Sequence, residues 1–113
     1  MRKIAIPLFL ILLFPTFALA GQIFGSLKQN GASIGKGAAV VIKCSENEKY
    51  EGQTDAYGSY NIYVPRAGKC AFMIYYGGRW SPAYYVYSDQ TDPVRYDFEL
   101  VKQPDGSFKL ERK

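Results

Sequence analysis

The stretch Val94-Arg95-Tyr96-Asp97-Phe98-Glu99-Leu100 carries the clearest structural signal in the sequence, because apolar and charged side chains alternate along its whole length. Successive side chains of a β-strand point to opposite faces of its sheet, so this alternation predicts a strand with one face in the core and the other in water. No long stretch of the chain has the 3.6-residue period of a helix. The stretch therefore favours a fold built from β-strands.

The rest of the chain shows similar patterns in short runs separated by turn signals. Asn30-Gly31, Gly77-Gly78 and Asp92-Pro93 are typical turn dipeptides. We expect strands over residues 22–27, 39–44, 50–54, 59–64, 69–76, 84–88, 94–102 and 107–111. The last two form a C-terminal hairpin around the Pro104-Asp105-Gly106 turn. Short strands at this spacing are typical of an all-β sandwich or barrel.

The start of the chain has the three parts of an export signal. Arg2 and Lys3 supply a positive start, residues 4–14 form an apolar run, and Ala18-Leu19-Ala20 is a small-residue cleavage site. The apolar run is too short for a stable membrane span. We predict a signal peptide over residues 1–20, a single domain over residues 21–113, and a periplasmic or extracellular location in a bacterium.

Composition and charge exclude several classes of protein. With 48% hydrophobic and 21% charged residues, the chain is neither disordered nor fibrous. The formal net charge of +4 includes Arg2 and Lys3 of the predicted signal. The other basic residues are scattered among acidic ones, so we expect no nucleic-acid partner. The sequence leaves the oligomeric state open.

Cys44 and Cys70 are the only cysteines, and both lie in the part of the chain that we expect to be exported. Each cysteine falls on the same face of its expected strand as the apolar side chains. An even pair of cysteines in a small exported domain indicates a disulfide, whereas two cysteines without histidine are too few for a structural zinc site. We therefore predict a Cys44–Cys70 disulfide in or beside the core.

A resemblance to a known family is carried by the stretch Gly52-Gln53-Thr54-Asp55-Ala56-Tyr57-Gly58-Ser59-Tyr60-Asn61-Ile62. It resembles the Thr-Asp-x-x-Gly-x-Tyr/Phe-x-aliphatic signature of carboxypeptidase regulatory-like domains. Four other segments resemble this family's pattern in the same order: Ile23-Phe24-Gly25-Ser26-Leu27, residues 37–42, residues 64–72 and residues 96–100. The resemblance covers roughly residues 21–101. Two departures are the absence of the usual proline before the second strand and Cys70 in place of an aromatic residue.

The resemblance implies a small antiparallel β-sandwich of the transthyretin-like or immunoglobulin-like type, with seven or eight strands and one disulfide in this chain. It also assigns structural roles in the turn after residue 54. Asp55 is expected to accept hydrogen bonds from the turn's own amides, and Gly58 to occupy a position with positive φ. We expect Asp55 to be structural rather than catalytic or calcium-binding.

The sequence offers no catalytic site. It contains no histidine, so a serine or cysteine nucleophile would lack its usual base. The acidic residues from which a carboxylate pair could be drawn are Glu46, Glu48, Glu51, Asp89 and Asp92. No acidic residue lies in the apolar context that raises a carboxyl pKa. We therefore expect a protein that is not an enzyme, with no catalytic residues, no metal and no cofactor.

Aromatic residues between positions 75 and 87 are the unusual feature of the composition. Trp80 lies between Gly77-Gly78 and Pro82, where a large ring is hard to bury, and Arg79 precedes it. Tyr84 and Tyr85 fall on opposite faces of an expected strand, so aromatic side chains occupy both faces. The candidate binding residues are Arg79, Trp80, Tyr84 and Tyr85. The alternative is that these rings simply pack and cap the core.

Two classes of function agree with these features. The first is a non-catalytic, secreted accessory or binding module of the cell envelope that contacts a glycan or a protein. The second is a structural or assembly protein whose sandwich pairs with others through strand edges.

Overall fold

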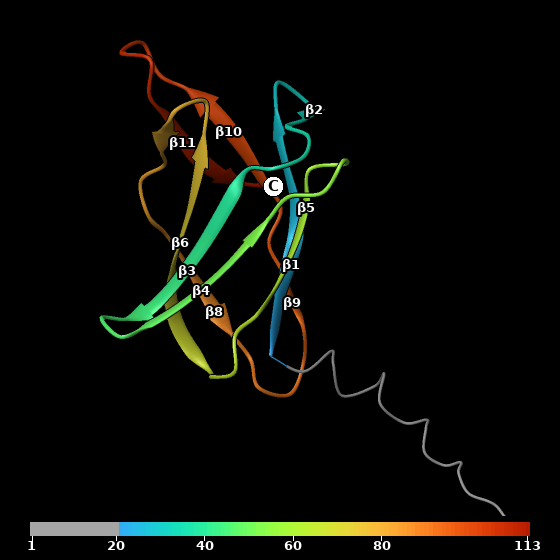
Figure 1. Cartoon of the computed structure of the whole chain (residues 1–113), viewed down its shortest axis with the longest axis vertical. Helices are drawn as coiled ribbons and strands as arrows, with labels where there is room; N and C mark the ends of the chain where they lie inside the picture. The colour runs from blue at the N-terminus through green and yellow to red at the C-terminus, as the bar shows by residue number, and fades with distance from the viewer. Residues whose placement is uncertain (1–20) are drawn as a thin grey trace, which may run out of the picture.

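The computed structural model describes residues 21–113, and this part of the chain forms two β-sheets packed face to face without a helix (Figure 1). The strands are β1 (Gln22–Gln29), β2 (Ala32–Ser33), β3 (Ala39–Ser45), β4 (Glu48–Gln53), β5 (Ser59–Tyr63), β6 (Gly68–Tyr76), β7 (Arg79–Trp80), β8 (Tyr84–Ser88), β9 (Val94–Arg95), β10 (Phe98–Lys102) and β11 (Phe108–Arg112). The predicted all-β sandwich is confirmed. The predicted export signal lies outside the described residues.

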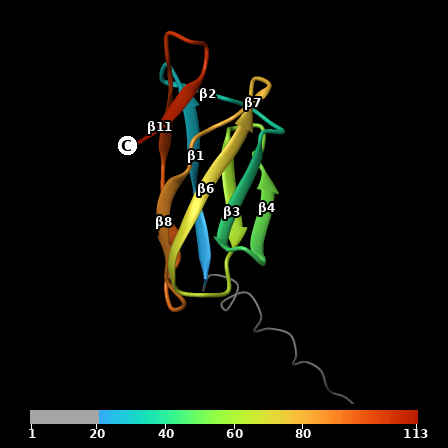
Figure 2. The same ribbon diagram turned by 90° about the vertical axis from the view of Figure 1, so that its left-hand side faces the viewer.

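One sheet has β1 at its centre. Strand β1 pairs with β5 and β2 on one side and with β9 and β10 on the other, and β11 completes the sheet beyond β10. In the second sheet the order is β4-β3-β6, and β7 and β8 both pair with β6. Figure 2 shows β1 and β11 on one side of the molecule and β3 and β4 on the other.

The core lies between the sheets and follows the alternation that the sequence predicts. Its largest fully buried side chains are Phe72, Phe98, Ile23, Leu27, Ile42, Ile74 and Leu100. The rings of Phe72 and Phe98 lie 4.8 Å apart between their centroids, and Tyr60 packs on Phe72 at 5.2 Å. Burial raises the pKa of Tyr60 far above its usual value. Its hydroxyl donates a 2.6 Å hydrogen bond to the carbonyl of Tyr96, which satisfies it.

Strand pairing differs from the prediction at β1, which runs parallel to β9 and β10 instead of antiparallel to them. The predicted single strand over residues 94–102 is interrupted at Tyr96 and Asp97. There the Asp97 carboxylate accepts hydrogen bonds from the backbone N–H of Ser26 at 2.8 Å and from the Arg95 side chain. Burial alone would raise the pKa of Asp97, but these hydrogen bonds outweigh it and hold that pKa below its usual value.

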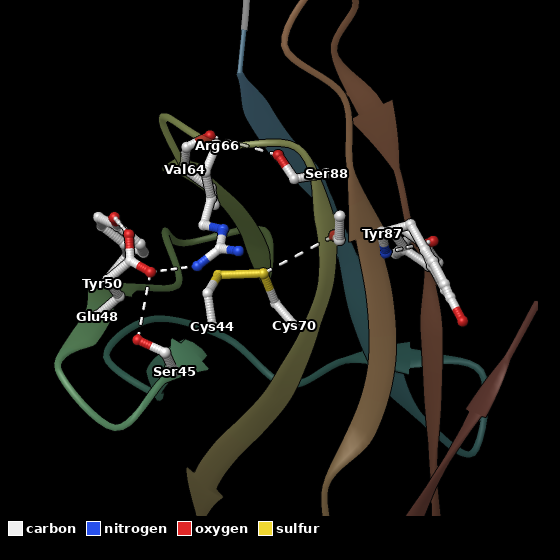
Figure 3. The surroundings of a disulfide bond; sticks show 11 residues. Cys44, Ser45, Glu48, Tyr50, Val64, Arg66, Cys70, Tyr87 and Ser88 are labelled. Carbon is white, nitrogen blue, oxygen red and sulfur yellow. Dashed lines mark hydrogen bonds and ion pairs between the residues drawn. A yellow bond between two sulfur atoms is a disulfide. The ribbon is translucent and has the colours of Figure 1, made fainter.

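The disulfide joins Cys44 near the end of β3 to Cys70 near the start of β6, with an S–S distance of 2.09 Å. These two strands are antiparallel neighbours, and Lys43 pairs with Ala71 beside the bridge. Cys70 is almost fully buried and Cys44 packs against the core. Figure 3 shows the Arg66–Glu48 ion pair close to the two sulfur atoms. The predicted bridge, in or beside the core, is confirmed.

The turn between β4 and β5 is held by Asp55. Its Oδ1 atom accepts hydrogen bonds from the backbone N–H groups of Tyr57 and Ser59 at 2.9 and 3.0 Å. Gly58 has φ of +74°, and its carbonyl accepts a hydrogen bond from the N–H of Leu27. A Cβ atom at Gly58 would lie 2.8 Å from the Leu27 carbonyl oxygen. The turn thus fixes the start of β5 against β1.

Replacing Gly58 with valine is expected to destabilise the protein by about 3 kcal/mol or more, because a β-branched residue is strained at positive φ and its Cβ would meet the β1 backbone. Chemical denaturation followed by circular dichroism measures the loss. Gly31→Val is the matched control, since Gly31 also has positive φ but open space around its Cβ position. Equal losses at the two positions would contradict the role of the Leu27 contact.

Candidate functional site

The outward surface of the β4-β3-β6-β8 sheet gathers most of the exposed aromatic side chains. We call it the aromatic face, and its side chains are Val41, Lys43, Lys49, Glu51, Lys69, Ala71, Met73, Tyr75, Trp80, Tyr85 and Tyr87. They share one side because alternate residues of each strand fill the core, as Val40, Ile42, Phe72 and Ile74 do. The aromatic face is therefore a direct consequence of the strand register.

Trp80 is placed on this face by a tight hairpin between β6 and β7. Gly77 and Gly78 both have positive φ, at 64° and 83°, as a two-residue type I′ turn requires. Trp80 then lies directly opposite Tyr75, with ring centroids 5.2 Å apart. The hydroxyl and N–H of Ser81 bond the backbone of Ile74 and hold the short strand in place. Trp80 is 53% exposed, although its position is firmly fixed.

Two tyrosines extend the aromatic face along β8. Tyr85 lies opposite Ala71 and Tyr87 opposite Lys69, and the two side chains are 59% and 50% exposed. The Lys69 ammonium lies 4.3 Å from the centroid of the Tyr85 ring, a cation–π contact. The partner of Tyr85 on β6 lies four positions along the strand from the partner of Trp80, which is about 13 Å. The aromatic rings thus occupy two separate positions on one surface.

A shallow depression lies beside Trp80, over β3 and β4. Its volume is about 230 Å³, and its lining is Val41, Lys43, Lys49, Met73 and Trp80. The apolar side chains of Val41 and Met73 form part of its floor, because they are neighbours across the β3–β6 ladder. The depression therefore combines an aromatic ring, an apolar floor and two ammonium groups.

The structure separates the four candidate residues into two pairs. Trp80 and Tyr85 lie on the aromatic face, whereas Arg79 and Tyr84 point to the opposite side of their strands. Tyr84 packs edge-on against Phe98, 4.9 Å between centroids, as part of the core. Arg79 lines another depression, of about 130 Å³, at the end of the sandwich near Phe108. Arg79 and Trp80 therefore lie on opposite faces of β7, and Arg79 does not belong to the aromatic face.

Sequence reasoning missed the residues around the two aromatic positions. In the sequence alone, Lys43 and Lys49 look like ordinary lysines in water, and Met73 looks like part of an apolar run. The alternation of residues 39–44 already predicts that the Lys43 side chain points to the other face of the sheet from Ile42. Only the pairing of β3 with β4 and β6 shows that these side chains meet Trp80 at one depression.

Residues 21–113 hold no cluster of three or more His, Cys, Asp and Glu side chains that could bind a metal ion. Over the same residues, no helix has the length and apolar character needed to cross a membrane. The aromatic face is thus the surface of the described chain with the most distinctive chemistry.

Comparisons with known proteins do not add a named relative to this description. No model of a known protein family matches the chain, and a search of curated proteins found no similar sequence.

Proposed function

We propose that the protein is an exported, non-catalytic binding module of the cell envelope and that it binds a glycan through the aromatic face. The observation that carries the proposal is the fixed but half-exposed Trp80 ring above an apolar depression with polar groups at its margin. A contiguous exposed patch of this kind, unlike a single exposed ring, often marks a binding site, and Trp80 shares the aromatic face with Tyr75, Tyr85 and Tyr87. The disulfide is consistent with an exported protein.

The chemistry of this surface suits a sugar. The C–H face of a pyranose ring is apolar and packs on an aromatic ring, while its hydroxyl groups need hydrogen-bond partners at the rim. Trp80 and Tyr85 supply the rings, and Lys43, Lys49 and Glu51 supply donors and acceptors. The two aromatic positions lie about 13 Å apart along β6, a spacing that a chain of several sugars could bridge.

The resemblance to carboxypeptidase regulatory-like domains remains part of the proposal. It is supported by the position of Gly25 in the central strand and by the Asp55 turn, both of which have structural roles that glycine and aspartate suit. A domain of this kind without catalytic groups fits an accessory function.

The alternative function, assembly through strand edges, has less support. Along the edge of the second sheet that β7 and β8 form, the N–H of Tyr87 already donates a 2.9 Å hydrogen bond to the Tyr96 hydroxyl. Ser81, Pro82 and Ala83 interrupt the same edge between β7 and β8, and proline cannot donate to a ladder. An edge interrupted in this way is a poor template for another strand.

Replacing Trp80 with alanine is expected to weaken glycan binding by about 2 kcal/mol, or about 30-fold, while lowering stability by less than about 1 kcal/mol. The loss of stability is smaller than the loss of binding because the Trp80 ring is half-exposed in the free protein. Isothermal titration calorimetry with soluble polysaccharides and thermal unfolding measure the two effects. Because Trp80 is the only tryptophan, its fluorescence should also shift when glycan binds.

The matched control is Tyr57→Ala, which removes an exposed aromatic ring from the β4–β5 turn, away from the aromatic face. It should leave the affinity unchanged. Equal affinities for the wild type and Trp80→Ala, with normal folding, would refute the proposed function.

A further inference from the structure

The two outer surfaces of the sandwich differ in how their charges are balanced. On the outer side of the sheet that contains β1, Arg95 pairs with Asp97, and Lys109 lies near Glu111. The aromatic face instead carries three lysines, Lys43, Lys49 and Lys69, against the single carboxylate of Glu51. The aromatic face therefore has an excess of positive charge.

The arrangement of two of these lysines is unfavourable for the protein alone. Lys43 on β3 and Lys49 on β4 are directly opposite one another in the antiparallel ladder. Like charges at such positions repel and destabilise a sheet. Glu51 balances the charge of only one of the two lysines, since its carboxylate lies 3.1 Å from the Lys49 ammonium. Within residues 21–113 no carboxylate lies within salt-bridge distance of Lys43.

The unbalanced lysines lie where the proposed function needs them. Lys43 and Lys49 line the same depression as Trp80, and Lys69 lies over the ring of Tyr85. Each aromatic position of the face therefore has ammonium groups beside it. A repeating ligand that presents an apolar ring face and a negative group in each unit would match both positions.

We infer that the ligand of the aromatic face is an anionic polysaccharide, an inference that rests on the proposed function. A sugar ring packs on Trp80, and its negative group lies between the ammonium groups of Lys43 and Lys49. Binding thereby removes the repulsion between the two lysines. Lysine suits this task because its ammonium is a compact charge with three N–H donors, which can bond carboxylate or sulfate oxygens from several directions.

The ionic part of this binding should depend on salt, because all three lysines are at the surface. Surface charges are screened over about 8–10 Å at ordinary ionic strength. We expect the affinity for an anionic polysaccharide to fall several-fold between low and high salt. Packing on Trp80 should keep a residual affinity at high salt.

The test measures the affinity of the purified protein for four probes: polygalacturonate, dextran sulfate, neutral dextran and polyglutamate. Polygalacturonate and dextran sulfate distinguish a carboxylate from a sulfate ligand, and either should bind at least about 10-fold more tightly than dextran. Lys43→Gln should remove most of this difference without lowering the melting temperature, because the variant loses a repulsion. Lys109→Gln, on the other sheet, is the matched control and should bind as the wild type does.

Three other outcomes would overturn the inference, and the first of them leaves the proposed function in place. Equal binding of dextran and both anionic probes, still lost in Trp80→Ala, would overturn the inference and leave glycan binding in place. No binding of any polysaccharide would overturn both. Binding of polyglutamate that Lys43→Gln abolishes but Trp80→Ala does not change would overturn both in favour of an acidic protein partner.

Discussion

Replacing Gly25 with alanine is expected to prevent stable folding, although the change adds only one methyl group. Gly25 lies in the middle of β1, where the chain of residues 94–98 passes alongside it. A Cβ atom at this position would lie 1.9 Å from the carbonyl oxygen of Tyr96 and 2.6 Å from its carbonyl carbon. Both are backbone atoms, so no side-chain rotation can relieve the overlap.

The backbone of Tyr96 is also unable to move away. Its N–H donates a 2.8 Å hydrogen bond to the Phe24 carbonyl, and its carbonyl accepts the buried hydroxyl of Tyr60. Its own hydroxyl accepts a hydrogen bond from the N–H of Tyr87, in the other sheet. Moving Tyr96 would therefore break contacts to both sheets, and we expect a loss above about 4 kcal/mol.

Urea denaturation followed by circular dichroism tests this expectation, and the yield of folded protein gives a second measure. Gly52→Ala is the matched control, because Gly52 also lies within a strand but its Cβ would meet only the Ile62 side chain, at 3.2 Å. That variant should fold with a loss of about 1 kcal/mol or less. If Gly25→Ala had the same urea denaturation midpoint as the wild type, the backbones of Gly25 and Tyr96 could not lie so close together.

The strands themselves are predictable from the sequence because period-two alternation marks which side chains enter the core. Val94, Tyr96, Phe98 and Leu100 illustrate this, since each points inward as expected. Strand neighbours are not predictable in the same way. Nothing in the alternation of residues 94–100 says that they run parallel to β1, because pairing depends on contacts between residues far apart in the chain.

The candidate site was only partly predictable for the same reason. The exposed position of Trp80 follows from the glycines and proline around it, which are local signals. The other side chains around Trp80 include residues of β3 and β4, which are far from it in sequence. Lys43 and Lys49 face one another only because of the register in which β3 and β4 pair. The separation of Arg79 from Trp80 was not predictable, because it depends on residues 79 and 80 forming a short strand, in which adjacent side chains point apart.

Removing the disulfide is expected to cost about 3–4 kcal/mol, a large share of the stability of a small domain. The bridge joins residues 26 positions apart and so restricts the unfolded chain. The segment that it closes contains β4 and β5, which belong to different sheets. The bridge therefore fastens the part of the chain that crosses from one layer of the sandwich to the other.

Three samples test the contribution of the bridge: the oxidised wild type, the wild type reduced under native conditions, and Cys44→Ser. Mass spectrometry should show the oxidised protein lighter than the reduced one by two hydrogens, with no thiol open to alkylation before reduction. Reduced wild type and Cys44→Ser should then unfold at similarly low denaturant concentrations, because both lose the same restriction of the unfolded chain. Ser45→Ala controls for a change beside the bridge that leaves it intact, since the Ser45 hydroxyl bonds only the exposed Glu48 side chain. If Cys44→Ser were as stable as the oxidised protein, packing between β3 and β6 alone would hold this end of the sandwich together.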